Sequence, residues 1–256
     1  MASSLHQKLF SAADSLRSKM DASEYKNYLL GLIFYKYLSE KTLDSVVTIL
    51  EESPEEYSST EAKTKLYQQY YHNELYHDVM IENLVTLNGY VIAPEYLFNS
   101  LAEKAKVNIF QIEDLTQAFT KLSSEFDQFK ELFNDIDLRT NKLGQNDQQR
   151  NLTISEVIKK LNEVDVLGHD GDVIGDAYEY LIGQFASESG KKAGEFYTPS
   201  QVSDMMARIV TLGQEDSKGF TVYDAAMGSR VIIMTTVVSN DGYRVSSPLL
   251  EKQNMK

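Results

Sequence analysis

The pattern of apolar positions near the start of the chain predicts an amphipathic helix. Between about His6 and Met20, apolar side chains recur every three or four residues, the spacing that places them on one face of a helix. The positions between them are mostly polar or charged, so this face should be buried and the opposite face solvated. The apolar positions that set the spacing are Leu9, Ala13, Leu16 and Met20.

The next segment, from Tyr28 to Leu38, is apolar nearly all round. Asp21 followed by Glu24 resembles a capping box, which favours a helix start just ahead of it. A helix that is apolar on all sides is normally buried, so we expect it at the centre of a helical bundle. The segment is shorter than the roughly 18 apolar residues that a membrane span needs, and Lys36 interrupts it.

The middle of the chain predicts further helices joined by polar loops. The Ser- and Glu-rich stretch 51–64 indicates a solvated loop that leads into a polar, tyrosine-rich helix near Tyr67–Asp78. Asn88-Gly89 is a turn signal before a short extended piece, Tyr90–Ile92, which Pro94 ends. The remaining helices are expected over Tyr96–Lys106, Ile112–Phe126 and Thr153–Val164, the last capped by Thr153 and preceded by a polar loop over 143–151.

The last third predicts two more helices and one strand. Apolar residues recur at helical spacing throughout Asp172–Ala186, and Thr198 is placed to cap a helix that starts at Pro199 and buries a stripe over 202–210. The segment Phe220–Asp224 predicts a short strand that ends in a carboxylate, and Gly228-Ser229 follows in a turn. Ligands bind outside the carboxyl ends of strands in open α/β sheets, but carboxylates and glycines also finish many strands without a ligand.

Composition narrows the possible functions. With 256 residues, 42% of them hydrophobic, the chain is long enough for two compact folded units. It has no cysteine, which excludes disulfides and thiolate chemistry and favours a reducing cytoplasm, and Met1–Phe10 lacks the charge and apolar pattern of a secretory signal. Its formal net charge of -13 argues against strong autonomous DNA binding, because Lys and Arg supply most phosphate contacts.

Four segments carry a resemblance to a known family. AADSLRSKMDASEYK (12–26) and LGLIFYKY (30–37) closely resemble the helical N-terminal domain of HsdM, the modification (methyltransferase) subunit of type I restriction-modification systems. GEFYTP (194–199) matches the family segment G-x-[FY]-[FY]-T-P, which packs against S-adenosylmethionine in N6-adenine methyltransferases. VYDAAMGS (222–229) resembles the family's methionine-binding loop, so the resemblance covers about residues 9–229.

The resemblance implies a cofactor site and also shows where this chain departs from the family. Ala225 stands where the family has proline, and Arg230 stands in place of its second glycine, where a bulky side chain would crowd the turn. These departures predict weak S-adenosylmethionine binding or none. The site residues carried over are Glu195, Phe196, Tyr197, Thr198, Pro199, Ser200, Asp224, Met227, Gly228 and Ser229, with no metal.

The family's catalytic motif, N-P-P-[FY], is absent, so no catalytic residue is assigned. In that motif polar groups bind the amine of a flipped adenine and the aromatic ring stacks on it. The β-branched run 231–238 favours a strand where the family has an apolar helix, and the tail 239–256 has no resemblance that we can identify, which suggests a frame change or a premature end in the coding sequence. None of the four prolines follows Asn or adjoins another: Pro54, Pro94, Pro199 and Pro248.

The fold that follows is mainly helical at first and α/β at the end. We expect a helical N-terminal domain over 1–165 and the incomplete start of a Rossmann-like methyltransferase domain over 166–256. The resemblance implies adenine-N6 methylation of DNA by a complex with a specificity subunit, a second modification subunit and a restriction subunit, this chain being inactive alone. The rival interpretation is a non-catalytic interaction module that only binds those partners.

Other groupings of polar residues are weaker. His72 and His77, with Glu74 and Asp78 nearby, suggest a metal site, but their spacing does not place both rings on one helical face and no third strong ligand is evident. A solvated helix surface is the favoured interpretation there. His169 lies among acidic loop residues and is best explained as loop polarity.

Overall fold

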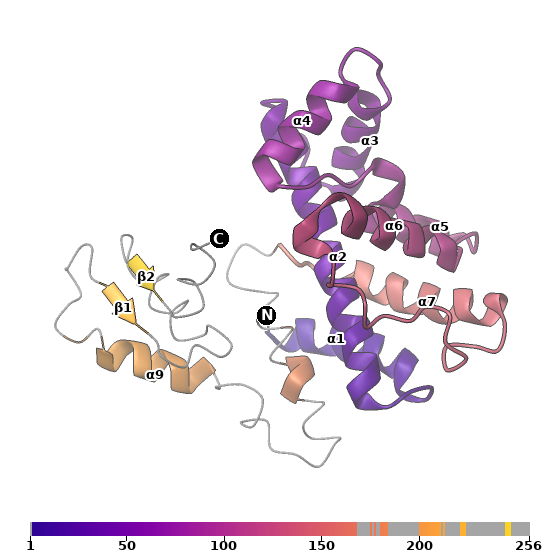
Figure 1. Ribbon diagram of the computed structural model, residues 1–256, viewed down its shortest axis with the longest axis vertical. Helices are drawn as coiled ribbons and strands as arrows, with labels where there is room; N and C mark the ends of the chain where they lie inside the picture. Colours follow the sequence, from indigo (N-terminus) through magenta and orange to yellow (C-terminus); the bar gives the residue numbers. More distant parts are fainter. Residues whose placement is uncertain are drawn as a thin grey trace. The chain divides into compact units, whose positions relative to one another are not determined.

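The computed structural model describes residues 2–167, 175, 177, 180–183, 200–210, 212, 221–223 and 244–246. The chain divides into two compact units, Met1–Phe185 and Ala186–Lys256. In the described residues of the first unit all regular structure is helical, which confirms the predicted helical N-terminal region (Figure 1). Its elements are α1 (Ala2–Arg17), α2 (Ala22–Ile49), α3 (Thr60–Tyr71), α4 (His77–Asn88), η1 (Pro94–Tyr96), α5 (Phe98–Lys106), α6 (Ile112–Glu125), η2 (Asp127–Phe129) and α7 (Asp147–Asn162).

Helix α2 is the central element, as its all-round apolar sequence predicts. It contacts α1, α3, α4, α5 and α7, and Figure 1 shows it running through the unit. Near its start the Tyr28 hydroxyl donates a hydrogen bond to the Asp137 carbonyl at 2.6 Å. Near its end Ser45 donates to Asn88 Oδ1 at 2.8 Å, which ties it to α4. The Ile136 side chain packs directly on Gly31, where a Cβ would lie 2.3 Å from Ile136 Cδ1 and would force that side chain to move.

Helices α1 and α7, far apart in the sequence, pack against each other. The apolar face predicted for α1 is buried, with Leu9 and Leu16 fully covered, and α7 contributes Ile158 and Leu161 to the same core. At the edge of this contact the Lys160 amine donates to the Ser11 carbonyl at 2.8 Å and to Ser15 Oγ at 2.9 Å. The two helices are therefore held by both apolar burial and polar contacts.

The prediction of a single helix near Tyr67–Asp78 is wrong, because the structure has two helices in this region. Helix α3 starts earlier, at Thr60, where Ser59 Oγ accepts from the Ala62 amide at 3.2 Å. It ends at Tyr71, and in the turn that follows Asn73 Oδ1 accepts from the Leu75 amide at 3.0 Å. Asn side chains compete in this way with helical hydrogen bonds, which explains the break. Helix α4 then ends at Gly89, whose φ of +79° confirms the Asn-Gly turn.

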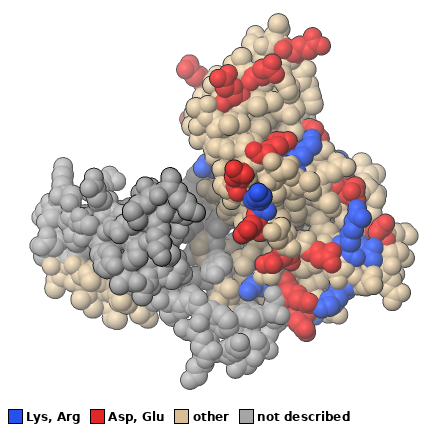
Figure 2. All heavy atoms as spheres, viewed as in Figure 1, with Lys and Arg blue, Asp and Glu red and all other residues tan. Residues whose placement is uncertain are grey.

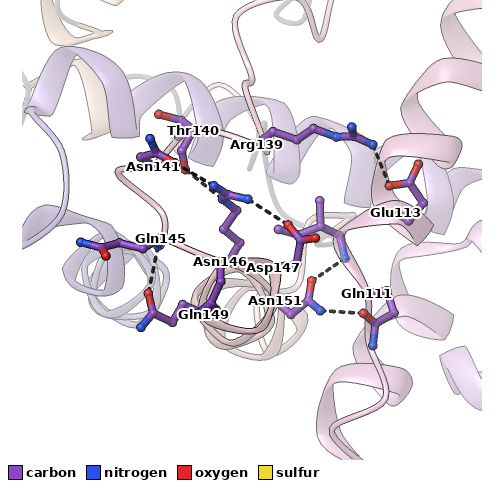
Figure 3. A network of polar contacts seen from close by, with 12 residues as sticks. Gln111, Glu113, Arg139, Thr140, Asn141, Gln145, Asn146, Asp147, Gln149 and Asn151 are labelled. Atoms are coloured by element: carbon purple, nitrogen blue, oxygen red, sulfur yellow. Dashed lines mark hydrogen bonds and ion pairs between the residues drawn. The ribbon is translucent and has the colours of Figure 1, made fainter.

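Helix α7 begins before the expected Thr153, because Asn146 is its N-cap. Asn146 Oδ1 accepts from the Gln149 amide at 2.9 Å, whereas Thr153 lies inside the helix and donates to the Leu143 carbonyl at 2.8 Å. Figure 3 shows the polar network around this start. Arg150 donates to the Thr140 carbonyl at 3.3 Å and to Asn141 Oδ1 at 2.8 Å, so the network holds the irregular segment 130–146 onto α7.

A further helical stretch after α7 belongs to the first unit. Residues 175, 177 and 180–183 are helical, in agreement with the helix predicted over Asp172–Ala186. Ala177, Leu181 and Ile182 are buried, and the Tyr180 ring stacks on His6 of α1 with centroids 4.4 Å apart. The first compact unit accordingly extends to Phe185.

This packing predicts the stability of two shortened chains, 1–167 and 1–185. Both should be helical by circular dichroism, because the core formed by α1 to α7 lies before residue 167. The longer chain should be more stable by about 2 kcal/mol, since burial of Leu181 and Ile182 contributes about 1.5–3 kcal/mol each before the cost of ordering the helix. Urea unfolding measures the difference. Equal midpoints would show that the added helix contributes nothing, and an unfolded 1–167 chain would contradict independent folding of α1 to α7.

The second unit is described through one helix and two strands. They are α9 (Ser200–Val210), β1 (Thr221–Tyr223) and β2 (Arg244–Ser246), and the strands pair in parallel with Val222 opposite Val245. The helix after Pro199 and the strand before Asp224 are thus confirmed. The predicted burial of the α9 stripe is wrong: Met205 is 55% exposed and Ile209 64% exposed, because no described element of this unit covers that face.

No helix in the part of the chain that the structure describes is both long and apolar enough to cross a membrane.

Candidate functional site

The residues predicted to bind the cofactor lie mostly outside the described residues. This applies to Glu195–Pro199, Asp224 and 227–229, while Ser200 is the first residue of α9. The described elements next to them match the expected frame, because α9 follows Pro199 directly and β1 ends at the residue before Asp224. Parallel pairing of β1 with β2 is also what an open α/β sheet requires.

The described helical unit contains a large groove that the sequence did not predict. Its volume is about 1330 Å³, and it is lined by the second half of α2, by α3 and α5, and by residues 162–167 after α7. Both apolar and charged side chains line it. The groove therefore lies beside the chain segment that leaves the last long helix of the bundle.

At the base of the groove a lysine and a glutamate of α2 form a buried ion pair. The Lys36 amine contacts Glu40 Oε1, with the two side chains only 4% and 16% exposed. The same amine lies 5.7 Å from the centre of the Phe98 ring, and the Val166 backbone amide hydrogen-bonds to Glu40. Burial raises the pKa of Glu40, and the neighbouring Lys36 opposes that rise. The pair thus joins α2 to α5 and to the segment after α7.

Elsewhere the lining of the groove includes many hydrogen-bond acceptors, which are hydroxyl, amide and carboxylate oxygens. Asn99 Nδ2 donates to Thr64 Oγ1 at 2.6 Å, and Thr64 donates in turn to the Thr60 carbonyl at 2.7 Å, which leaves Asn99 Oδ1 buried without a hydrogen-bond partner. The other lysines on the groove pair with carboxylates: Lys63 with Asp44, Lys65 with Glu61 and Lys106 with Glu103, at 2.5 to 2.7 Å.

The metal site considered from the sequence does not form in the described part of the helical unit. Among the described residues no group of three or more His, Cys, Asp or Glu side chains is placed to hold a metal ion. His77, which the sequence suggested as a metal ligand, lies with Nδ1 2.5 Å from the Tyr71 carbonyl and packs against the Tyr71 ring. A contact of this kind stabilises the α3–α4 turn. In the structure His77 therefore packs in the turn between α3 and α4.

One signal of the buried pair was visible in the sequence. Lys36 interrupts an otherwise apolar helix, and Glu40 follows at the i+4 spacing that favours a Lys–Glu contact. A lysine in a fully buried helix needs a partner, because an unpaired charge away from water is very costly. That requirement would have identified Glu40 before the structure.

Comparisons with family models divide the chain earlier than the fold does. The model of the HsdM N-terminal domain matches residues 5–161, and the model of the N-6 DNA methylase family matches residues 169–244. The first match covers α1 to α7, and the second covers the helical residues 175, 177 and 180–183 that pack in the first unit, as well as α9, β1 and the start of β2.

Individual relatives show the same similarity. The methylase subunit of the type I restriction enzyme MpnII from Mycoplasma pneumoniae is 28% identical over 91% of this chain and 44% of its own length. The MjaVII methylase subunit from Methanocaldococcus jannaschii is 27% identical over 87% of this chain and 33% of its own length. A crystal structure of a type I restriction-modification methyltransferase subunit from Streptococcus thermophilus is 41% identical, with a TM-score of 0.81, over 96% of this chain and 52% of that chain. The chain thus spans about half the length of these proteins, or less.

Proposed function

Because the chain belongs to the HsdM family of type I restriction-modification methyltransferase subunits, we propose that it acts in methylation of adenine N6 in DNA. The observation that carries this proposal is the ordered match of the helical domain and then the methylase domain, together with the helical fold shared with the crystal structure from Streptococcus thermophilus. The family uses S-adenosylmethionine as methyl donor. In this chain the segments 195–200 and 224–229 are the proposed cofactor site.

We propose that the chain acts only within a complex. Its net charge of -13 leaves little means of holding DNA without a partner. By analogy with the family, a specificity subunit would read and bind the duplex while two modification subunits enclose it and a restriction subunit joins. Mixing the chain with the specificity subunit of its own system and a duplex carrying the target tests this. A complex with DNA should form only when the specificity subunit is present, and tight DNA binding by the chain alone would contradict the proposal.

The proposed cofactor site makes a quantitative prediction for Phe196 and Tyr197. Replacing either residue with Ala should weaken S-adenosylmethionine binding by about 1–3 kcal/mol, because an aromatic side chain packed on the cofactor is lost. Isothermal titration calorimetry measures the effect. Tyr76→Ala, at a half-exposed tyrosine of the helical unit, is the matched control and should leave binding unchanged. Tight binding that survives both substitutions would place the site elsewhere.

The absence of the N-P-P-[FY] motif favours a second candidate function. A chain that keeps the helical domain but lacks the adenine pocket would be a non-catalytic interaction module, which occupies the partner subunits without methylating DNA. The two functions differ in one result. Both predict association with the specificity subunit, and only the first predicts S-adenosylmethionine binding that depends on Phe196 and Tyr197.

A further inference from the structure

The turn before α4 and the outer side of α4 combine exposed apolar residues with carboxylates. We call this surface the α4 patch; the apolar members are strongly exposed, with Leu75 at 83%, Val79 at 55% and Leu87 at 54%. Between Leu66 and Glu103 the sequence has no Lys or Arg. On the face seen in Figure 2, the outermost end of the helical unit carries red carboxylates and no blue cations, while the lysines of α3, Lys63 and Lys65, lie in the first half of that helix. The patch consists of Glu74, Leu75, Tyr76, Asp78, Val79, Glu82 and Leu87.

The apolar residues of the patch do not serve the core of the unit. The inner face of α4 already supplies Met80 and Leu84, which are 3% and 0% exposed and lie in the main core. Leu75 in the turn before the helix, Val79 on another side of the helix and Leu87 near its end remain in water. Exposed apolar side chains gathered in one region and rimmed by charged residues are the kind of surface that marks interaction sites.

The charge of the patch decides what kind of partner fits it. DNA and anionic lipid are excluded, because phosphates would approach Glu74, Asp78 and Glu82 with no cation to receive them. A second copy of this chain, docked symmetrically through the same patch, would place those three carboxylates against their own copies, and like charges across an interface are costly. The complementary surface has apolar side chains flanked by Lys or Arg.

We propose that the α4 patch docks a basic amphipathic helix of another protein subunit. Its apolar stripe covers Leu75, Val79 and Leu87, and its cations meet the surrounding carboxylates, the arrangement found where an amphipathic helix lies on a complementary surface. This inference rests on the proposed function, in which the specificity and restriction subunits are the protein partners. It assigns the α3–α4 end of the helical domain to protein contacts and the DNA to other parts of the complex.

Two variants of the patch and one control test the proposal in the full chain. Leu75→Ser with Val79→Ser removes apolar surface, and Asp78→Lys with Glu82→Lys reverses charge. The control, Val107→Ser with Ile109→Ser, removes apolar residues that are 63% and 61% exposed but lie beside Lys104 and Lys106. Biolayer interferometry measures binding to the specificity subunit and to the restriction subunit of the same system. Both patch variants should bind one of these subunits at least about tenfold more weakly, while the control stays within about twofold.

Thermal unfolding of each variant separates docking from folding. The melting temperatures of the patch variants should match that of the unmodified chain, because these side chains are outside the core. Binding of both subunits within twofold of the unmodified chain would overturn the proposal, as would a loss of melting temperature that accounts for the weaker binding, or a loss confined to DNA. An unmodified chain that binds neither subunit would instead overturn the proposed function itself.

Discussion

The purified chain is expected to transfer no methyl group to DNA, either alone or with a specificity subunit. Methyl transfer needs a held cofactor, an extruded adenine and polar groups fixed around its amine, all in one place. The sequence lacks the Asn-Pro-Pro segment that would bind the adenine, and Arg230 stands where the cofactor turn calls for a small residue. Loss of one positioning group leaves slow turnover in many enzymes, whereas loss of the substrate pocket should leave none.

Incorporation of tritium from labelled S-adenosylmethionine into adenine measures this directly. The positive control is a family member that contains the N-P-P-[FY] motif, assayed with its own specificity subunit and target duplex. It should label the DNA to completion under conditions in which this chain gives only background counts. Label on adenine N6 with no other methyltransferase subunit present would refute the prediction and would show that an unrecognised segment supplies the pocket.

Single substitutions in the buried Lys36–Glu40 pair should destabilise the helical unit strongly. Lys36→Met or Glu40→Leu alone leaves a buried charge without its partner, which costs about 3 kcal/mol or more. The double variant removes both charges and fills the space with apolar atoms, so its stability should lie within about 1 kcal/mol of the unmodified chain. The expected signature is therefore a large favourable coupling between the two positions.

Urea unfolding at two pH values measures these stability changes. The pH dependence distinguishes the cost of burying an unpaired Glu40 carboxylate from the mere removal of a charge. Burial raises the pKa of Glu40 above its ordinary 4.5, and loss of Lys36 raises it further. A carboxyl whose pKa is raised in the folded state stabilises that state fully when the pH is below its pKa in the unfolded chain. This stabilisation is lost as the pH rises through the pKa of the folded state. The defect of Lys36→Met should thus be largest at pH 7 and smaller at pH 5.

The exposed pair Lys65–Glu61 is the matched control for this cycle. Its side chains have the same i, i+4 spacing on α3 but are 72% and 79% exposed, so Lys65→Met should cost less than about 1 kcal/mol at either pH. Equal effects at the two pairs would show that water screens the Lys36–Glu40 contact as well. Independent additive effects of Lys36→Met and Glu40→Leu would likewise contradict a direct contact.

The spacing of apolar residues predicted the helices that bury one face in the core, and also the central helix that is buried nearly all round. Helices α2, α5 and α6 occur where the pattern placed them, because their spacing follows directly from burial. The apolar pattern did not predict the two helices over 60–88. The many Tyr and Gln residues of α3 make its apolar spacing weak, and the helix breaks where Asn73 Oδ1 accepts a hydrogen bond from the Leu75 amide. It also placed the start of α7 too late, since Asn146 caps the helix seven residues before Thr153, within a segment whose sequence indicates a loop.

The candidate sites differ in how they can be found from sequence. The proposed cofactor segments were inferred from motifs, and the structure describes only the helix α9 and the strand β1 next to them. The buried pair was readable in principle from Lys36 and Glu40. The groove was not, because it arises from α2, α3, α5 and residues 162–167, which only the tertiary fold brings together.

The contact between α1 and α7 has a consequence for synthesis of the chain. Ser15 and Lys160, which hydrogen-bond across it, are separated by 145 residues. At ribosomal rates of about 5–20 residues per second, the first helix waits ~7–30 s for its partner to be made. Of the two described helices that pack most extensively against α1, only α2 has been made during that interval, so Leu9 and Leu16 of the nascent chain are available to chaperones until α7 emerges.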